Sequence, residues 1–139
     1  MTVRELYDSF SKYIPEDLRC EWDNDGLMVS TDSSADVTDV LIALDVTEEI
    51  VDYAIERGFN LIISHHPLIF RPVSAITEEN HISRKIIKLI SNNISVFSFH
   101  TRADIVCGGV NDILAAKLGL TNVTPFGEDG MGRIGTLPT

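Results

Sequence analysis

The chain alternates between apolar runs and polar stretches, and the period of the apolar positions predicts where helices and strands lie. At the start, Thr2 and Glu5 match a capping box. Apolar side chains then recur at helical spacing until Pro15 ends the run. This pattern predicts an amphipathic helix that packs on a core.

Three short, nearly continuous apolar runs follow, at Val40–Leu44, Phe59–Ser64 and Ile94–Phe99. Two segments with a single apolar stripe separate them, and these predict helices. The stripes consist of Ile50, Val51, Ala54 and Ile55, and of Ile82, Ile86, Leu89 and Ile90. Strand, helix and strand in succession indicate βαβ units. We therefore predict an α/β fold with a layered, mostly parallel sheet and helices on its faces.

The segment 20–30 has a different character, because acidic residues surround Trp22 before a short apolar run at Leu27–Val29. We interpret it as a loop that leads into a strand. A solvated turn with a buried tryptophan is favoured over a calcium loop, since the spacing of oxygen ligands is incomplete. Residues 32–39 are predicted to be a polar connection.

The C-terminal third carries weaker signals. A polar loop with glycines is predicted after His100, followed by a helix from about Val110 to Lys117 that Gly119 ends. Asn122–Phe126 is compatible with a further short strand, and the glycine-rich tail after it has no closing signal. We expect residues 1–139 to form a single α/β metal-binding domain.

The formal net charge is -10, and residues 1–52 hold fourteen acidic against three basic side chains. Such a balance disfavours nucleic-acid binding, which depends on clustered lysine and arginine. The two cysteines have no metal-binding or redox spacing. No apolar run approaches membrane-spanning length, and no signal-peptide pattern is present. The sequence predicts a soluble, cytoplasmic protein.

Polar residues occupy the ends of all three apolar runs: Asp45 after the first, His65 and His66 after the second, and His100 after the third. The carboxyl ends of parallel strands line one crevice of an open sheet, which is the usual place for a site. One such histidine alone would most often be a hydrogen-bonded core residue. Three together favour a metal site.

Pro67 is expected to keep His66 extended, so the two neighbouring histidines should point apart. Each could then hold one of two divalent ions, with Asp104 as the nearest candidate for a bridging carboxylate. Imidazole and carboxylate ligands suit zinc, iron, manganese, cobalt or nickel without choosing among them. The predicted metal ligands are therefore His65, His66, His100 and Asp104.

Other polar residues near these strand ends are given structural interpretations. His81 is expected at the surface, and Cys107 is expected to be a small buried side chain. Ser64 lacks the glycines of a nucleophile elbow, so a serine hydrolase is disfavoured. Arg71 and Arg102 are expected to be surface residues, although either could meet a phosphate.

Several motifs together resemble the Nif-three-like family, whose members are named GTP cyclohydrolase 1 type 2 homologues. The resemblance runs through nearly the whole chain. It rests on EWDNDGLMVS, LDVTEEIVDYAIERG, LIISHHPLIF, FHTRADIVCGGVNDILAAKLGL and GMGRIGTLP. The chain departs from the family's usual pattern at Arg102, where an asparagine is more common.

The resemblance implies a dinuclear metal site whose ligands map onto the four residues named above. It also implies a toroidal homo-oligomer, typically a homohexamer, and a metal-dependent hydrolase acting on a small molecule such as a nucleotide. Family members continue through a second α/β half that returns a further histidine and a glutamate to the metals. The resemblance therefore predicts that this chain is the N-terminal half of such a protein.

Two functions from different classes follow. The first is a hydrolase with a dinuclear site that activates water, in a GTP cyclohydrolase-like reaction. The second is a non-catalytic metal-binding scaffold that oligomerises and engages partners. A third interpretation is that the histidines are purely structural. It requires histidines to occur by chance at strand ends that meet at one edge of the sheet.

Overall fold

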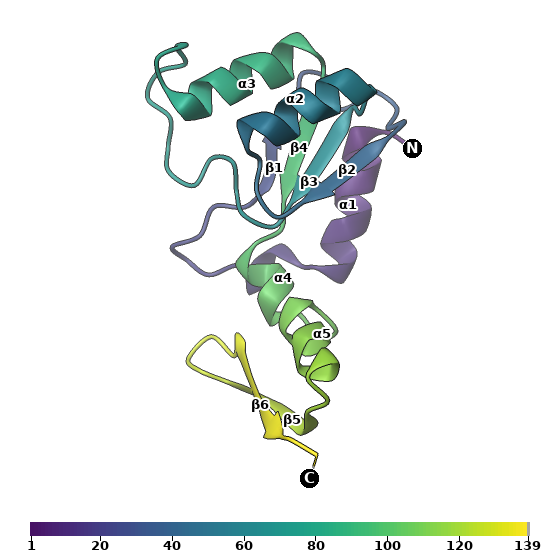
Figure 1. The fold of residues 1–139 in the computed structure, drawn as a ribbon, viewed down its shortest axis with the longest axis vertical. Coiled ribbons are helices and arrows are strands. Elements are labelled where there is room, and N and C mark those ends of the chain that lie inside the picture. Colours follow the sequence, from purple (N-terminus) through teal and green to yellow (C-terminus); the bar gives the residue numbers. More distant parts are fainter. Residues whose placement is uncertain (139) are drawn as a thin grey trace.

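The computed structural model describes residues 1–138, and its central element is a four-stranded sheet in the order β1-β4-β3-β2 (Figure 1). The strands are β1 (Gly26–Val29), β2 (Val40–Ala43), β3 (Leu61–Ser64) and β4 (Ser95–Ser98). Strands β2, β3 and β4 are parallel, and β1 runs antiparallel to β4. The predicted α/β class with a mostly parallel sheet is confirmed.

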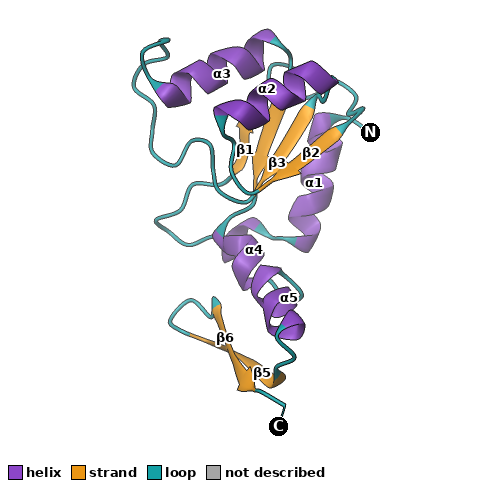
Figure 2. Ribbon diagram, in the orientation of Figure 1, coloured by secondary structure: helices purple, strands orange, loops and turns teal. Residues whose placement is uncertain are grey.

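Three helices cover this sheet, two on one face and one on the other (Figure 2). The pair consists of α2 (Glu48–Arg57) and α3 (His81–Ser91), and the single helix is α1 (Val3–Tyr13), followed by a short 3-10 turn at Glu16–Leu18. None of the helices among residues 1–138 is long and apolar enough to cross a membrane.

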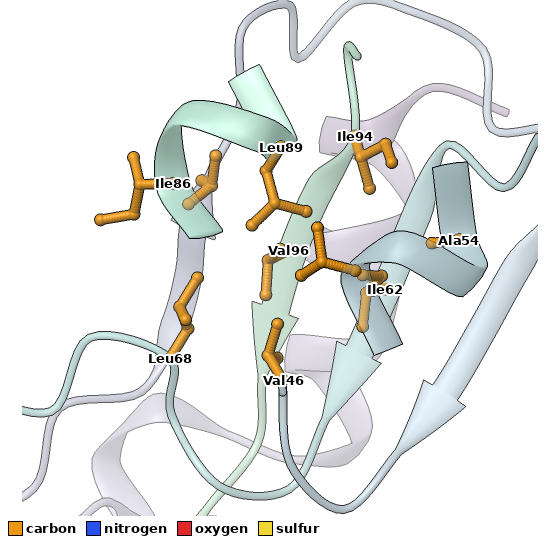
Figure 3. Packing of buried hydrophobic residues seen from close by; sticks show 10 residues of the cluster. Val46, Ala54, Ile62, Leu68, Ile86, Leu89, Ile94 and Val96 are labelled. Carbon is orange, nitrogen blue, oxygen red and sulfur yellow. The ribbon is translucent and has the colours of Figure 1, made fainter. Parts of the chain in front are cut away.

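Alternating side chains of the central strands fill two separate cores. Ile62 and Val96 point toward α2 and α3, where they pack with Ala54 and Leu89 (Figure 3). Leu61 and Phe97, one position away, belong to the cluster beneath α1. This alternation follows from the two-residue period of a strand, and it explains why both central strands are apolar throughout.

Local side-chain and backbone chemistry defines the ends of α1 and α2, and it includes the capping box predicted at Thr2 and Glu5. Thr2 and Glu5 form both bonds of the capping box on α1. The Thr47 side chain accepts from the Ile50 N–H at the start of α2. Gly58 ends α2 with φ 74°, a left-handed conformation that favours glycine.

The C-terminal third extends away from the sheet as α4 (Thr101–Ile105), α5 (Val110–Lys117) and a hairpin of β5 (Thr121–Phe126) and β6 (Gly132–Thr136) (Figure 1). The α5 bounds match the prediction. The loop predicted after His100 is wrong over its first residues, which form α4. The tail also contains β6, a strand that the sequence pattern did not indicate.

The antiparallel direction of β1 determines what lies at the carboxyl edge of the sheet. Gly26, its first residue, pairs with Ser98, the last residue of β4. The residues just before Gly26 therefore lie beside the segment that follows β4. Gly26 has φ 118°, and a Cβ there would come within 2.8 Å of the Tyr7 hydroxyl, so this position requires glycine.

Candidate metal centre

Three histidines converge at the carboxyl edge of the parallel strands. His65 and His66 follow β3 directly, and His100 lies two residues beyond β4. One ligand nitrogen from each ring can be chosen such that all three lie within 4.8 Å of one another. The sequence therefore identified side chains that the fold does bring together.

The neighbouring histidines do not point apart, contrary to the expectation from extended backbone. The chain bends at His65 and His66, and their ring centroids are 5.0 Å apart. The Ser64 hydroxyl donates to the carbonyl of His66 at 2.9 Å and so stabilises this bend. Both imidazoles can consequently face one cation.

Two of the histidines are oriented by carboxylates. His66 Nδ1 lies 2.8 Å from Asp45 Oδ1, and His100 Nδ1 lies 2.8 Å from Asp23 Oδ1. Because an ionised carboxylate only accepts hydrogen bonds, each Nδ1 carries the proton. The Nε2 atom of each ring is then left with a lone pair, which is the arrangement typical of metal-binding histidines.

Asp23 is central to the site, although the sequence pattern gave it the role of a solvated turn residue. Its side chain is fully buried, and it also accepts hydrogen bonds from the backbone N–H and the hydroxyl of Thr101. Burial alone would raise the pKa of Asp23, but the hydrogen bonds from His100 and Thr101 outweigh it and lower this pKa. The solvated-turn interpretation is wrong, because β1 carries this segment into the sheet edge.

His65 is less exposed than His66, and its partner is Asp104. The distance from His65 Nε2 to Asp104 Oδ2 is 3.6 Å. Burial lowers the pKa of His65, while the Asp104 carboxylate opposes this shift. A lowered pKa favours neutral imidazole, the form that binds a metal. Asp104 lies on α4 and not on a loop.

The donor set fits a transition-metal cation. Three imidazoles converge, the Asp104 carboxylate lies 3.6 Å from the ring of His65, and two of the rings have the tautomer that exposes Nε2. Such nitrogen-rich sets suit zinc, iron, manganese, cobalt or nickel better than calcium. The acidic residues before β1 are engaged with His100 and its neighbours, which also argues against a calcium loop there.

Arg102 is a buried structural residue, so its expected surface position is wrong. Its side chain has no exposed area, and its Nε donates to Asp25 Oδ2 at 3.0 Å. The remaining nitrogens donate to the carbonyl of Ile14 and the hydroxyl of Tyr7. Because this guanidinium is buried and already hydrogen-bonded within the protein, it is not available to bind a phosphate.

Two further side chains have the opposite exposure to that expected, and a third is as predicted. Trp22 is 60% exposed instead of buried. Cys107 is exposed and not a small core residue. His81 is exposed at the start of α3, as predicted.

A cavity of about 500 Å³ opens beside His66. Its lining includes Asp45, Thr47, His81 and Lys85. The Lys85 ammonium donates to the carbonyl of Val46 at 2.7 Å, and burial lowers the pKa of this lysine. The sequence pattern did not indicate a role for Lys85, because this residue lies outside the apolar stripe of α3, where lysines are usually solvated.

Proteins of similar sequence carry the name that the family resemblance implies. A protein of Clostridium acetobutylicum named GTP cyclohydrolase 1 type 2 homolog is 40% identical over 141 residues, which cover 96% of this chain and 52% of that relative. A protein of Lactococcus lactis with the same name is 38% identical over 138 residues, 99% of this chain and 53% of that relative. The chain spans about half the length of the curated relatives it matches.

Solved structures of similar fold include members of the same family. A Bacillus cereus protein related to NIF3 superposes with a TM-score of 0.82 at 43% identity, over 91% of this chain and 36% of that one. Reduced HcgD from Methanocaldococcus jannaschii gives a TM-score of 0.89 at 33% identity, over 97% of this chain and 54% of that one. The family model described as Duf34/NIF3 (NGG1p interacting factor 3) matches residues 1–139. With sequence, fold and family model in agreement, the chain belongs to the DUF34/NIF3 family.

Proposed function

We propose that this chain supplies the ligands of a dinuclear site in a cytoplasmic, metal-dependent hydrolase. His65, His66, His100 and Asp104 would hold two divalent cations. The observation that carries the proposal is the convergence of three imidazoles whose ligand atoms lie within 4.8 Å of one another. The Asp104 carboxylate beside His65 extends this donor set.

When bound, a pair of such cations lowers the pKa of a water and polarises the bond to be hydrolysed. The chain's own carboxylates orient the histidine ligands and fix which ring nitrogen carries the proton. Asp23 and Asp45 keep the proton on Nδ1 of His100 and His66, which leaves Nε2 as the donor atom. We assign no general acid among residues 1–138.

A small molecule, and a nucleotide in particular, is the proposed substrate. The names of the clostridial and lactococcal relatives support a GTP cyclohydrolase-like reaction. In that reaction one water adds to C8 of the purine and opens the five-membered ring to a formamide, and a second water hydrolyses the formamide to release formate. The cavity beside His66, one of the three clustered histidines, offers room for a small ligand.

The first test is the metal content of gently purified protein, measured by elemental mass spectrometry. We expect close to two equivalents per chain in the wild type and a loss of metal in His65→Ala and His100→Ala. His81→Ala is the matched control, because this fourth histidine is exposed on α3. One equivalent would contradict the second ion, and unchanged metal in the first two variants would contradict the site.

The second test is hydrolysis of nucleotide and phosphoester panels by the metal-loaded protein, with Asp104→Ala alongside. We expect turnover that this substitution abolishes, because it removes the only carboxylate among the proposed ligands. Activity that survives Asp104→Ala would contradict its role.

A non-catalytic, homo-oligomeric scaffold is the second candidate function. The exposed apolar side chains of edge strand β2 favour it, since Ile42 is 78% exposed and Leu44, just beyond the strand, is 61% exposed. A homohexamer is the assembly we propose for either function. Absence of turnover, together with an oligomer that persists when His65 and His66 are replaced by alanine, would favour the scaffold.

A further inference from the structure

Three aromatic side chains form a corner beside the histidine cluster. The ring centroids of Trp22 and Phe70 are 6.4 Å apart, and each lies 6.3 to 6.4 Å from the ring of His100. The angles between the ring planes are 65°, 83° and 88°, so no two of these rings are stacked. We call Trp22, Phe70 and His100 the aromatic corner.

The corner is open to solvent. Trp22 is 60% exposed and Phe70 is 44% exposed. Aromatic side chains usually bury most of their large surface, so two exposed rings in contact mark a surface that can gain free energy by binding. The contacts between the rings are edge-to-face and not stacked, and the exposed surface of Trp22 and Phe70 is available for stacking with a ligand.

Both exposed rings are attached to loops that are fixed in place. Asp23, next to Trp22, bonds the His100 ring and Thr101. The side-chain amide of Asn24 donates to the carbonyl of Ile69, next to Phe70, and thereby links the two loops. A ligand would therefore meet a corner that is already organised, which lowers the ordering cost of binding.

The corner is continuous with the candidate metal centre. His100 belongs to both, and its ring centroid lies 5.2 Å from that of His65 and 5.7 Å from that of His66. A planar ring seated against Trp22 or Phe70 would therefore present its edge toward the proposed metal ligands. This is where a substrate ring must lie for a metal-activated water to attack it.

We infer that the aromatic corner is a binding subsite for the planar heteroaromatic ring of a small-molecule substrate. The inference rests on the proposed hydrolase function, since it gives that site its substrate class. Trp22 and Phe70 are specificity-determining residues that hold the ring by stacking. The net charge of -10 argues against a nucleic-acid strand as the occupant.

The chain contains one tryptophan, so its emission reports on the corner alone. The experiment titrates the metal-free protein with inosine, a neutral purine nucleoside, and in parallel with ribose, which has the same sugar without the ring. Free N-acetyltryptophanamide corrects for light absorbed by inosine. We expect saturable quenching of Trp22 by inosine and none by ribose.

Phe70→Leu keeps the fluorophore and removes one stacking ring. We expect it to weaken inosine binding about tenfold, the size of one base-aromatic contact. Phe126→Leu is the matched control, because Phe126 is 56% exposed on β5, away from the histidines. Quenching that Phe70→Leu leaves unchanged, equal quenching by ribose, or no saturable quenching by inosine would overturn the inference.

A second copy of the chain is the competing occupant. Emission of Trp22 that shifts to shorter wavelength as protein concentration rises would mean that another copy covers the corner, and this would also overturn the inference. Neither probe carries a phosphate and no metal is present, so the result is independent of metal binding. Failure of the proposed function would appear separately, in metal content and turnover.

Discussion

Carboxylates behind the histidines decide how well this site can bind a metal. Asp23 and Asp45 make the same bond, each to the Nδ1 of one histidine at 2.8 Å. Their surroundings differ, since the Asp23 side chain is fully buried and that of Asp45 is 53% exposed. Water can replace the exposed carboxylate as an acceptor, but it has little access to the buried one.

We therefore expect Asp23→Asn to weaken metal binding by roughly 10- to 100-fold, as the loss of a partner behind a ligating histidine does. Asp45→Asn should cause a smaller loss, because solvent can accept the Nδ1 proton of His66. Competition with a chromophoric chelator measures both affinities. Wild-type affinity in Asp23→Asn, or a larger loss in Asp45→Asn, would contradict this role.

Two arginines near the site provide a second prediction. Arg102 and Asp25 form a pair in which both side chains are fully buried. Replacing Arg102 by methionine removes the buried charge partner of Asp25 and leaves only the partly exposed Arg19 at 3.7 Å, which should lower the free energy of unfolding by about 3–5 kcal/mol. Urea denaturation measures this change. Arg71→Met, at an exposed position, should stay within about 0.5 kcal/mol, and equal effects in the two variants would refute the distinction.

The sequence predicted that the histidines, Asp104 and Asp45 lie at this edge of the sheet, but it did not predict that Asp23 and Asp25 join them. The histidines stand at the ends of apolar runs, so local periodicity places them at the sheet edge. Asp23 and Asp25 reach the same edge only because β1 pairs antiparallel with β4. That pairing joins residues far apart in the sequence, and no local pattern specifies it. The burial of Arg102 and the exposure of Trp22 follow from the same pairing.

At the scale of elements, local chemistry was sufficient wherever caps and periodicity agreed. It was insufficient for α4, whose five residues are too few to show a helical period. The His100 side chain at its N-cap makes no capping bond. Instead, the N–H groups of His100 and Thr101 donate to the carboxylates of Asp25 and Asp23. Tertiary contacts thus cap α4, and they also carry Asp104 toward His65.

An ion pair contributes to the attachment of the C-terminal hairpin. Arg133 on β6 bonds Asp112 on α5 and donates to the carbonyl of Ile105 at 3.0 Å. Asp112 also accepts from the N–H of Gly108 at 2.7 Å. The bond from Arg133, together with that from Gly108, lowers the pKa of Asp112.

Because the pKa of Asp112 is lowered in the folded state, its ionised carboxylate stabilises the fold at neutral pH. This stabilisation is lost on acidification. Wild type should therefore be more stable than Asp112→Asn at neutral pH. This difference should shrink as pH falls below the unfolded value of about 3.9 and through the lower native pKa. Urea midpoints across this range measure it. A difference that stays constant down to a pH of about 2 would contradict the assignment.

At the scale of the whole molecule, the two faces of the sheet are covered unequally. Helices α2 and α3 share one face, whereas α1 alone covers the other (Figure 2). Register places Val40 and Ile42 of β2 opposite Leu61 and Ile63, which belong to the α1 side. Strand β2 is also the sheet edge farthest from β1. Its residues on the α1 side are consequently left open, with Ile42 78% exposed.

An edge strand with exposed apolar side chains is a surface that favours self-association. We expect the chain to associate in a concentration-dependent manner, and Ile42→Lys to weaken that association at least tenfold by placing a charge at the contact. Sedimentation velocity over a range of concentrations measures the effect. Ile87→Lys is the control, because Ile87 is 39% exposed on α3 and not on the sheet edge. A wild-type chain that remains monomeric, or equal weakening by both substitutions, would mean that β2 is not the assembly surface.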